Sequence, residues 1–150
     1  MKKSIISKFV SIILKIILSL GSISLFFIPY IYNFIGEYQN ITFDDQTILY
    51  KTALYISAII VLYIIFELIR IFGLVYKENP FNKNTEYSLK RIAISLMALS
   101  ILTLTKSIFM PTLLSFSIAL ILFVGSLGVY VLSQVFKTAI EYKNEIDYTV

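Results

Sequence analysis

The stretch TALYISAIIVLYIIFELIRIFGLV, residues 52–75, decides the fold of this chain. Only Glu67 and Arg70 in it carry a charge. About 20 apolar residues are enough for an α-helix to cross the ~30 Å hydrocarbon core of a membrane. The apolar residues lack the alternation of a strand, and an open strand in lipid would leave backbone groups without hydrogen bonds. The stretch is therefore predicted to be a membrane-spanning helix.

Three further blocks of this kind occur, at residues 9–32, 89–110 and 112–136. Hydrophobic residues make up 58% of the chain and charged residues 15%, whereas a soluble domain is about half apolar and a quarter charged. The first block is too long for the core of a cleaved signal peptide, so we expect it to be retained. Short connections favour antiparallel neighbours. We therefore predict one all-α domain, an integral membrane four-helix bundle in up-down order.

The positive charges predict a direction across the membrane. Lys and Arg concentrate before the first block and between the second and third, whereas residues 33–47 contain none. Basic residues favour the cytoplasmic side. Frequent Lys, Ile and Asn are typical of an AT-rich bacterial genome. Both termini are therefore predicted to lie on the cytoplasmic side of a bacterial cell membrane, with a short cytoplasmic C-terminal helix and tail at residues 137–150.

Histidine and cysteine are absent from the chain. A Ser-His-Asp or Cys-His pair for nucleophilic catalysis is therefore excluded, as are disulfides and the commonest zinc ligands. No pair of acids suited to chemistry within the membrane stands out. The sequence thus predicts a protein without enzymatic activity, metal or other cofactor. Transport is also disfavoured, because no series of acids or amides crosses the predicted spans.

Small and polar residues recur at helical spacing within three of the blocks. The series are Ser115, Ala119, Leu122, Ser126, Tyr130 and Ser133 in the fourth block, Arg91, Ser95, Ala98 and Thr105 in the third, and Ser4, Lys8, Ser11, Lys15, Ser19 and Ser22 in the first. Small residues let helix backbones approach closely in lipid. We interpret these series as packing faces of the bundle, and a water-filled pathway lined by the serines is the alternative.

Lys15, Glu67 and Arg70 are the candidate polar residues within the spans. An ionisable residue in lipid costs about 3 kcal/mol or more and usually marks a functional site. Glu67 lies roughly 24 Å along the helix from Lys51, near the cytoplasmic border. One interpretation is a pair between Glu67 and Arg70, three residues apart on one helix, with Lys15 as an interfacial anchor. The other is a contact between Lys15 and Glu67 that links two helices.

The segment KENPFNKNTEYSLKRIA, residues 77–93, connects the second and third blocks. Asn79, Pro80 and Phe81 are predicted to form a cytoplasmic turn, because proline cannot continue a helix. Asn84 or Thr85 is then predicted to cap the third helix.

The turn, the basic restart after it and the chain end VFKTAIEYKNEIDYTV (residues 135–150) together resemble the bacterial domain-of-unknown-function 2975 family. The matching residues are Pro80, Phe81, Lys90, Arg91, Phe136, Lys137, Glu145, Asp147, Thr149 and Val150. Thr138–Ala139 and Tyr148 are mild departures from the family pattern, and the resemblance covers roughly residues 75–150. It implies a small four-span membrane protein without known catalytic activity. It also implies that a small helix-turn-helix DNA-binding protein of the Xre/Cro type is encoded beside it.

The C-terminal segment is the candidate docking site for such a partner. A fourth helix that continues past Phe136 places Phe136 and Ile140 on one side. Beyond Asn144, apolar residues alternate with polar ones, which favours a strand that pairs with the sheet edge of a partner. The candidate partner-binding residues are Phe136, Ile140, Glu145, Asp147, Thr149 and Val150. Two alternatives remain, docking back onto the Asn79–Phe81 turn and fraying in solvent.

Together these features indicate a non-enzymatic membrane regulator or tether that acts with a small DNA-binding protein and does not itself contact nucleic acid. An immunity or envelope-stress protein against membrane-active peptides is the alternative, and a transporter subunit is the third choice. The predicted partners are the lipid bilayer, the Xre/Cro-type protein and, in a homo-oligomer, a second copy of the chain.

Overall fold

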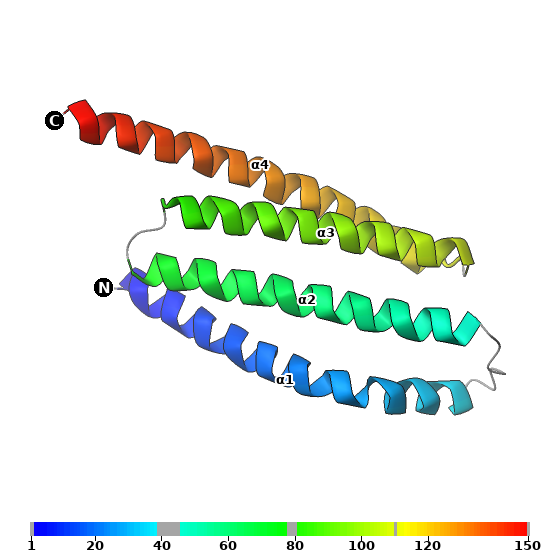
Figure 1. Cartoon of the computed structure of the whole chain (residues 1–150). Helices are drawn as coiled ribbons and strands as arrows, with labels where there is room; N and C mark the ends of the chain where they lie inside the picture. The colour runs from blue at the N-terminus through cyan, green and yellow to red at the C-terminus, as the bar shows by residue number, and fades with distance from the viewer. Residues whose placement is uncertain (1, 39–45, 78–80, 110, 150) are drawn as a thin grey trace.

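The computed structural model of the chain describes residues 2–38, 46–77, 81–109 and 111–149. These residues form four helices and no strand: α1 Lys2–Tyr38, α2 Gln46–Tyr76, α3 Lys83–Phe109 and α4 Leu113–Thr149 (Figure 1). Each helix contains a segment long and apolar enough to cross a membrane. The chain is thus a multi-pass membrane protein, and the predicted all-α fold with four apolar helices is confirmed.

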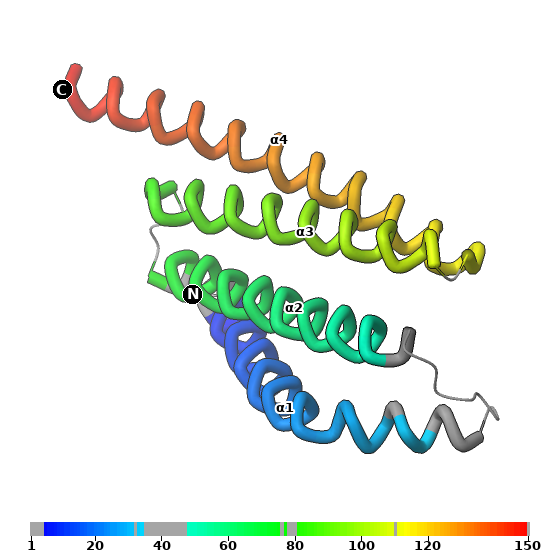
Figure 2. Tube along the Cα trace, turned by 45° about the vertical axis from the view of Figure 1, so that its right-hand side comes forward, coloured from blue at the N-terminus to red at the C-terminus, as the bar shows by residue number. Residues whose placement is uncertain are grey.

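The helices lie side by side in chain order, as an open row and not as a closed bundle (Figures 1 and 2). α1 packs on α2, α2 on α3 and α3 on α4, whereas the described residues of α1 and α4 do not meet. Lipid tails are as apolar as leucine, so no hydrophobic force closes such a row. The predicted up-down order is confirmed, and the bundle is corrected to a row. The start of α1, the end of α2, the start of α3 and the end of α4 lie at one end, called the terminal end below (Figure 1).

Side-chain caps begin the last two helices. The Oδ1 atom of Asn82 accepts a hydrogen bond from the backbone N–H of Asn84 at 3.2 Å, and the Asn82 carbonyl accepts one from Thr85 at 2.9 Å. Asn82 is therefore the cap of α3, and the prediction of Asn84 or Thr85 is wrong by two or three residues. Thr112 caps α4, because its hydroxyl accepts from the N–H of Ser115 at 3.3 Å. Such caps satisfy backbone donors that have no partner within the helix.

Serine hydroxyls join α3 to α4. Ser126 on α4 donates to the carbonyl of Ala93 at 2.8 Å, and Ser100 on α3 donates to the carbonyl of Ala119 at 2.9 Å. All four residues are buried, and Ala119 is 0% exposed. A hydroxyl reaches a neighbouring backbone only where small side chains let the helices approach closely. This interface therefore depends on the small residues in its contact face.

A glycine gives α1 its close approach to α2. A Cβ atom built on Gly21 would lie 2.7 Å from Cδ2 of Leu62, so any larger residue there must displace that side chain. Nearer the terminal end, Ser7 donates a hydrogen bond to the carbonyl of Phe72 at 3.0 Å. α1 also contains Pro29, and Figure 2 shows that α1 changes direction along its length. Proline removes one helical hydrogen bond and kinks a helix.

α4 continues without a break from Leu113 to Thr149, far beyond the predicted span at residues 112–136. The fourth helix continues past Phe136 as predicted, but it forms no short helix of its own, and the predicted strand after Asn144 is wrong for the described residues. Starting a helix is costly, whereas extending one adds a hydrogen bond for each residue ordered. A helix already fixed in the membrane is thus easily continued by the Ala, Glu and Lys residues of this segment. As a result, the last turns of α4 extend past the start of α3 (Figure 1).

Candidate functional site

Glu67 on α2 is a buried charged residue, with a side chain that is 1% exposed. Nη1 of Arg91 on α3 donates a hydrogen bond to Oε1 of Glu67 at 2.9 Å. The hydroxyl of Tyr63, one turn earlier on α2, donates to the same oxygen at 3.2 Å. A carboxylate at membrane depth requires a compensating charge, because lipid solvates it poorly. Arg91 supplies that charge and thereby links α2 to α3.

Some polar atoms near this ion pair have no partner. Oε2 of Glu67 and the hydroxyl of Ser88 are buried and form no hydrogen bond with the described part of the chain. The Ser88 side chain lies beside the Glu67 carboxyl. A hydroxyl can donate and a carboxylate can accept, so these two groups are chemically complementary. We call Tyr63, Glu67, Ser88 and Arg91 the Glu67 cluster, and its geometry serves helix packing.

The partner of Glu67 differs from both predicted partners. Within the described residues neither Arg70 nor Lys15 pairs with it, and both of these side chains are exposed. α1, which carries Lys15, packs against α2 on another face, at Leu62. The pairing of Arg91 with Glu67 could have been predicted from their distances to the helix ends. Glu67 stands nine residues before the end of α2, and Arg91 stands eight after the start of α3, so antiparallel packing brings them to one depth.

A second feature lies at the terminal end, where the turn after α2 meets α4. The rings of Phe81 and Phe136 stack with their centroids 5.5 Å apart and their planes at 29°. Ile140, one turn after Phe136, is buried, with 6% of its side chain exposed. Aromatic pairs of this kind contribute about 0.5–1.5 kcal/mol beyond the area they bury. The contact therefore holds α4 against the turn.

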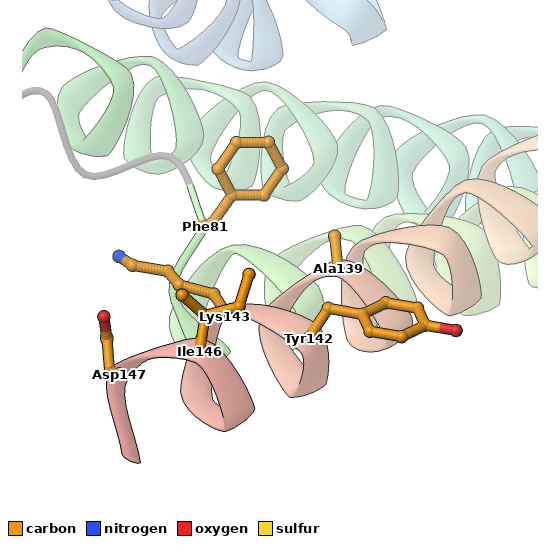
Figure 3. A pocket seen from close by; sticks show the side chains of 6 residues that line it. All are labelled: Phe81, Ala139, Tyr142, Lys143, Ile146 and Asp147. Atoms are coloured by element: carbon orange, nitrogen blue, oxygen red, sulfur yellow. The ribbon is translucent and has the colours of Figure 1, made fainter. Parts of the chain in front are cut away.

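Beyond the stacked rings, a groove of ≈ 450 Å³ opens between Phe81 and the last turns of α4, and we call it the terminal groove (Figure 3). Its other lining residues are Ala139, Tyr142, Lys143, Ile146 and Asp147. Figure 3 shows Lys143 and Asp147 at one end, and the ring of Tyr142 extending toward the other. Tyr142 is 63% exposed and Ile146 is 62% exposed. The groove thus offers an apolar surface with one positive and one negative group at its rim.

Both features provide contacts and neither has the composition of a metal site. Among the residues that the structure describes, no group of three or more Asp, Glu, His or Cys side chains could hold a metal ion. The Glu67 cluster joins two helices, and the terminal groove is an open, largely apolar surface.

A family model described as Protein of unknown function (DUF2975) matches residues 30–150. The chain belongs to the DUF2975 family. Comparisons with curated proteins and with solved structures found no match. The predicted resemblance to DUF2975 proteins is thus confirmed, and the match reaches further toward the N-terminus than the motifs did. It includes both the Glu67 cluster and the terminal groove.

The DUF2975 tail residues predicted to bind a partner fall into two groups. Phe136 and Ile140 face inward, as the alternative of docking back onto the turn predicted, so they anchor α4 and are not free to bind. The hydroxyl of Thr149 donates to the carbonyls of Glu145 and Ile146 in its own helix. The exposed members of the set are Glu145, Asp147 and Thr149. Asn79, Pro80 and Val150 lie outside the described residues.

Tyr142 and Ile146 are the groove residues that the sequence did not reveal. The predicted strand placed Ile146 and Tyr148 on one edge. In a helix, Tyr142 and Ile146 are four residues apart and share a face, whereas Tyr148 does not join them. Reading the tail at helical spacing would have found this pair.

Proposed function

We propose that this DUF2975 protein is a non-enzymatic membrane regulator or tether. In this proposal it holds a small DNA-binding protein of the Xre/Cro type at the cytoplasmic face of a bacterial cell membrane. The observation that carries the proposal is the terminal groove, where Tyr142 and Ile146 are more than half exposed on a helix end that projects past α3. An exposed apolar patch with a polar rim is typical of an interaction site.

The charge of the projecting helix end favours a basic, soluble partner. Its exposed charged residues are Glu141, Lys143, Glu145 and Asp147, so acids outnumber bases. DNA-binding proteins carry basic surfaces. The cytoplasmic surface of a membrane is anionic and repels an acidic segment. The end of α4 is therefore better suited to such a protein than to the lipid surface.

The proposal also requires the terminal end of the row to face the cytoplasm. Of the 13 Lys and Arg residues, only Lys51 and Lys106 stand toward the opposite end. Basic residues near span ends favour the cytoplasmic side. This distribution supports an orientation with both termini inside.

Cysteine labelling tests the orientation, because the chain has no cysteine of its own. Tyr148→Cys, at a position 91% exposed, is expected to react with an impermeant maleimide only after the cells are permeabilised. Pro111→Cys, in the exposed turn between α3 and α4, is the matched control and is expected to react in intact cells. Labelling of Tyr148→Cys in intact cells would exclude a cytosolic partner.

Docking is tested by substitutions in the terminal groove. Tyr142→Ala is expected to weaken binding of the neighbouring helix-turn-helix protein about 30-fold, as loss of an aromatic hot spot does. The measurement is the Kd between the purified partner and the full chain in nanodiscs. Tyr148→Ala removes an equally large ring that does not line the groove, and we expect less than a twofold change.

Two outcomes would contradict docking at this groove. The first is equal weakening by Tyr142→Ala and Tyr148→Ala, and the second is full binding by a chain that lacks residues 141–150. The immunity alternative would replace the proposal if deletion of the gene sensitised cells to a membrane-active peptide and this shortened chain restored resistance.

A further inference from the structure

An apolar groove of ≈ 430 Å³ runs between α3 and α4 in the membrane-spanning part of the row. This volume falls in the range of small-molecule sites, about 300–1,000 Å³. The lining includes Ile94, Met97, Ala98, Ile101, Leu127 and Tyr130. Ser126 also lines it, but its hydroxyl is already donated to the carbonyl of Ala93. The walls therefore present hydrocarbon and the side chain of one tyrosine.

Two lysines continue the faces that line this groove, toward the terminal end. Lys90 precedes Ile94 by one helical turn, and Lys137 follows Tyr130 by two turns. Residues four or seven apart share a helix face. Both lysine side chains are exposed, and neither forms an ion pair with the described part of the chain. Beyond the groove, toward the terminal end, each of its two helices thus carries one exposed lysine that forms no ion pair with the described residues.

A comparable groove between α1 and α2 lacks these charges. It has a volume of ≈ 440 Å³ and is lined by residues that include Ile17 and Ile65. At the positions one and two turns from these residues that share their faces, toward the terminal end, the side chains are apolar: Leu14, Ile13, Val10, Leu68, Ile69 and Phe72. The α3–α4 groove therefore differs from the α1–α2 groove in having a lysine further along each of its two faces.

We propose that the α3–α4 groove binds a phospholipid with an anionic headgroup. One acyl chain lies along the apolar walls, and the headgroup phosphate accepts hydrogen bonds from Lys90 and Lys137. A lipid can reach the groove because it lies in the membrane-spanning part of α3 and α4, at the level of the hydrocarbon core. Basic side chains at the end of such a groove select anionic over zwitterionic headgroups. The site is separate from the terminal groove and does not depend on the docking proposal.

Native mass spectrometry of the purified full chain tests this site with phosphatidylglycerol and phosphatidylcholine as probes. The chain is expected to retain phosphatidylglycerol and to lose phosphatidylcholine. The double variant Lys90→Gln with Lys137→Gln is expected to retain phosphatidylglycerol roughly 30-fold less well, since each lysine near a membrane surface contributes about a factor of five. Lys8→Gln with Lys77→Gln removes the same charge from exposed positions outside the groove and is expected to change retention less than twofold.

A third variant separates the acyl site from the lysines. Ala98→Phe fills the groove from an exposed position and leaves both lysines in place, and it is expected to lower phosphatidylglycerol retention at least tenfold. Unchanged retention in Ala98→Phe would overturn the proposal. Equal losses in the two lysine double variants would overturn it as well, since the effect would then be one of overall charge. Equal retention of phosphatidylglycerol and phosphatidylcholine by the unaltered chain would also overturn the proposal.

Discussion

Replacing Arg91 with methionine is expected to lower the free energy of unfolding by about 3 kcal/mol. The substitution keeps an apolar side chain of similar length but removes the countercharge that lies 2.9 Å from Glu67. Glu67 is 1% exposed, so its carboxylate would remain at membrane depth without water or a cation. The measurement is reversible unfolding in mixed micelles as denaturing detergent is added.

The converse substitution, Glu67→Gln, is expected to lower the free energy of unfolding by less, about 1 kcal/mol. Arg91 is 44% exposed and can be solvated when its partner is lost. A chain with both substitutions is expected to be more stable than Arg91→Met alone, because no buried charge then remains. Arg70→Met, at an exposed position on α2, is the matched control. Equal losses of stability from Arg91→Met and Arg70→Met would show that the ion pair does not stabilise the fold.

The Glu67–Arg91 pair is a side-chain contact between the two halves of the row. α1 with α2 and α3 with α4 are each held by serine-to-carbonyl hydrogen bonds, whereas Arg91 reaches from α3 to a side chain of α2. The terminal groove is built from Phe81 and α4, and Arg91 does not line it. Arg91→Met is therefore expected to reduce stability while it leaves the proposed docking surface in place. This separates a loss of fold from a loss of binding.

The number and approximate extent of the helices could be predicted, because a long apolar block in lipid has one stable backbone structure. The open row could not. A helix that faces lipid on both sides and a helix inside a bundle have similar hydropathy, so composition does not distinguish them. The end of α4 was also missed, since alternating apolar residues at the chain end fit a strand locally. The membrane-embedded part of the same helix overrides that local preference.

The packing faces were predicted correctly for one helix and wrongly for two. In α4, Ala119, Ser126 and Ser133 are buried as expected. In α1 and α3, most members of the predicted series are exposed or only partly buried. Serine and threonine hydroxyls can donate hydrogen bonds to carbonyls of their own helix. Ser22 donates to the carbonyl of Leu18, and Thr105 donates to that of Ile101. A hydroxyl in lipid therefore does not reveal where the neighbouring helix lies.

The candidate site was predicted in part for a related reason. Proline and phenylalanine after the second span predicted a turn, and Phe81 contacts the tail at Phe136. Which residues of the tail stay exposed depends on helical phase, and that phase is set by the packing of α4 in the membrane. Ile140 and Tyr142 are two residues apart, yet the first is buried and the second is exposed.

Because the packing of α4 sets which tail residues are exposed, we expect a second large loss, of stability and of partner binding, from Ala119→Leu in the middle of the α3–α4 interface. Ala119 is 0% exposed, and its carbonyl accepts a hydrogen bond from Ser100 at 2.9 Å. A leucine there must force the helices apart, which typically costs about 1–3 kcal/mol, and it also weakens the serine hydrogen bond. Because α4 is continuous, the shift is transmitted to the Phe81–Phe136 stack, so partner binding is expected to fall along with stability.

The same unfolding assay and the nanodisc binding assay measure these two losses. Gly125→Leu is the matched control, because a Cβ on Gly125 meets no atom within 4 Å and its side of α4 is exposed. It introduces the same side chain six residues further along the helix and is expected to leave both quantities nearly unchanged. If Ala119→Leu lowered stability but left binding intact, the end of α4 would be positioned by the turn alone. If both leucine variants were equally harmless, the α3–α4 contact could not be the close-packed interface on which the terminal groove depends.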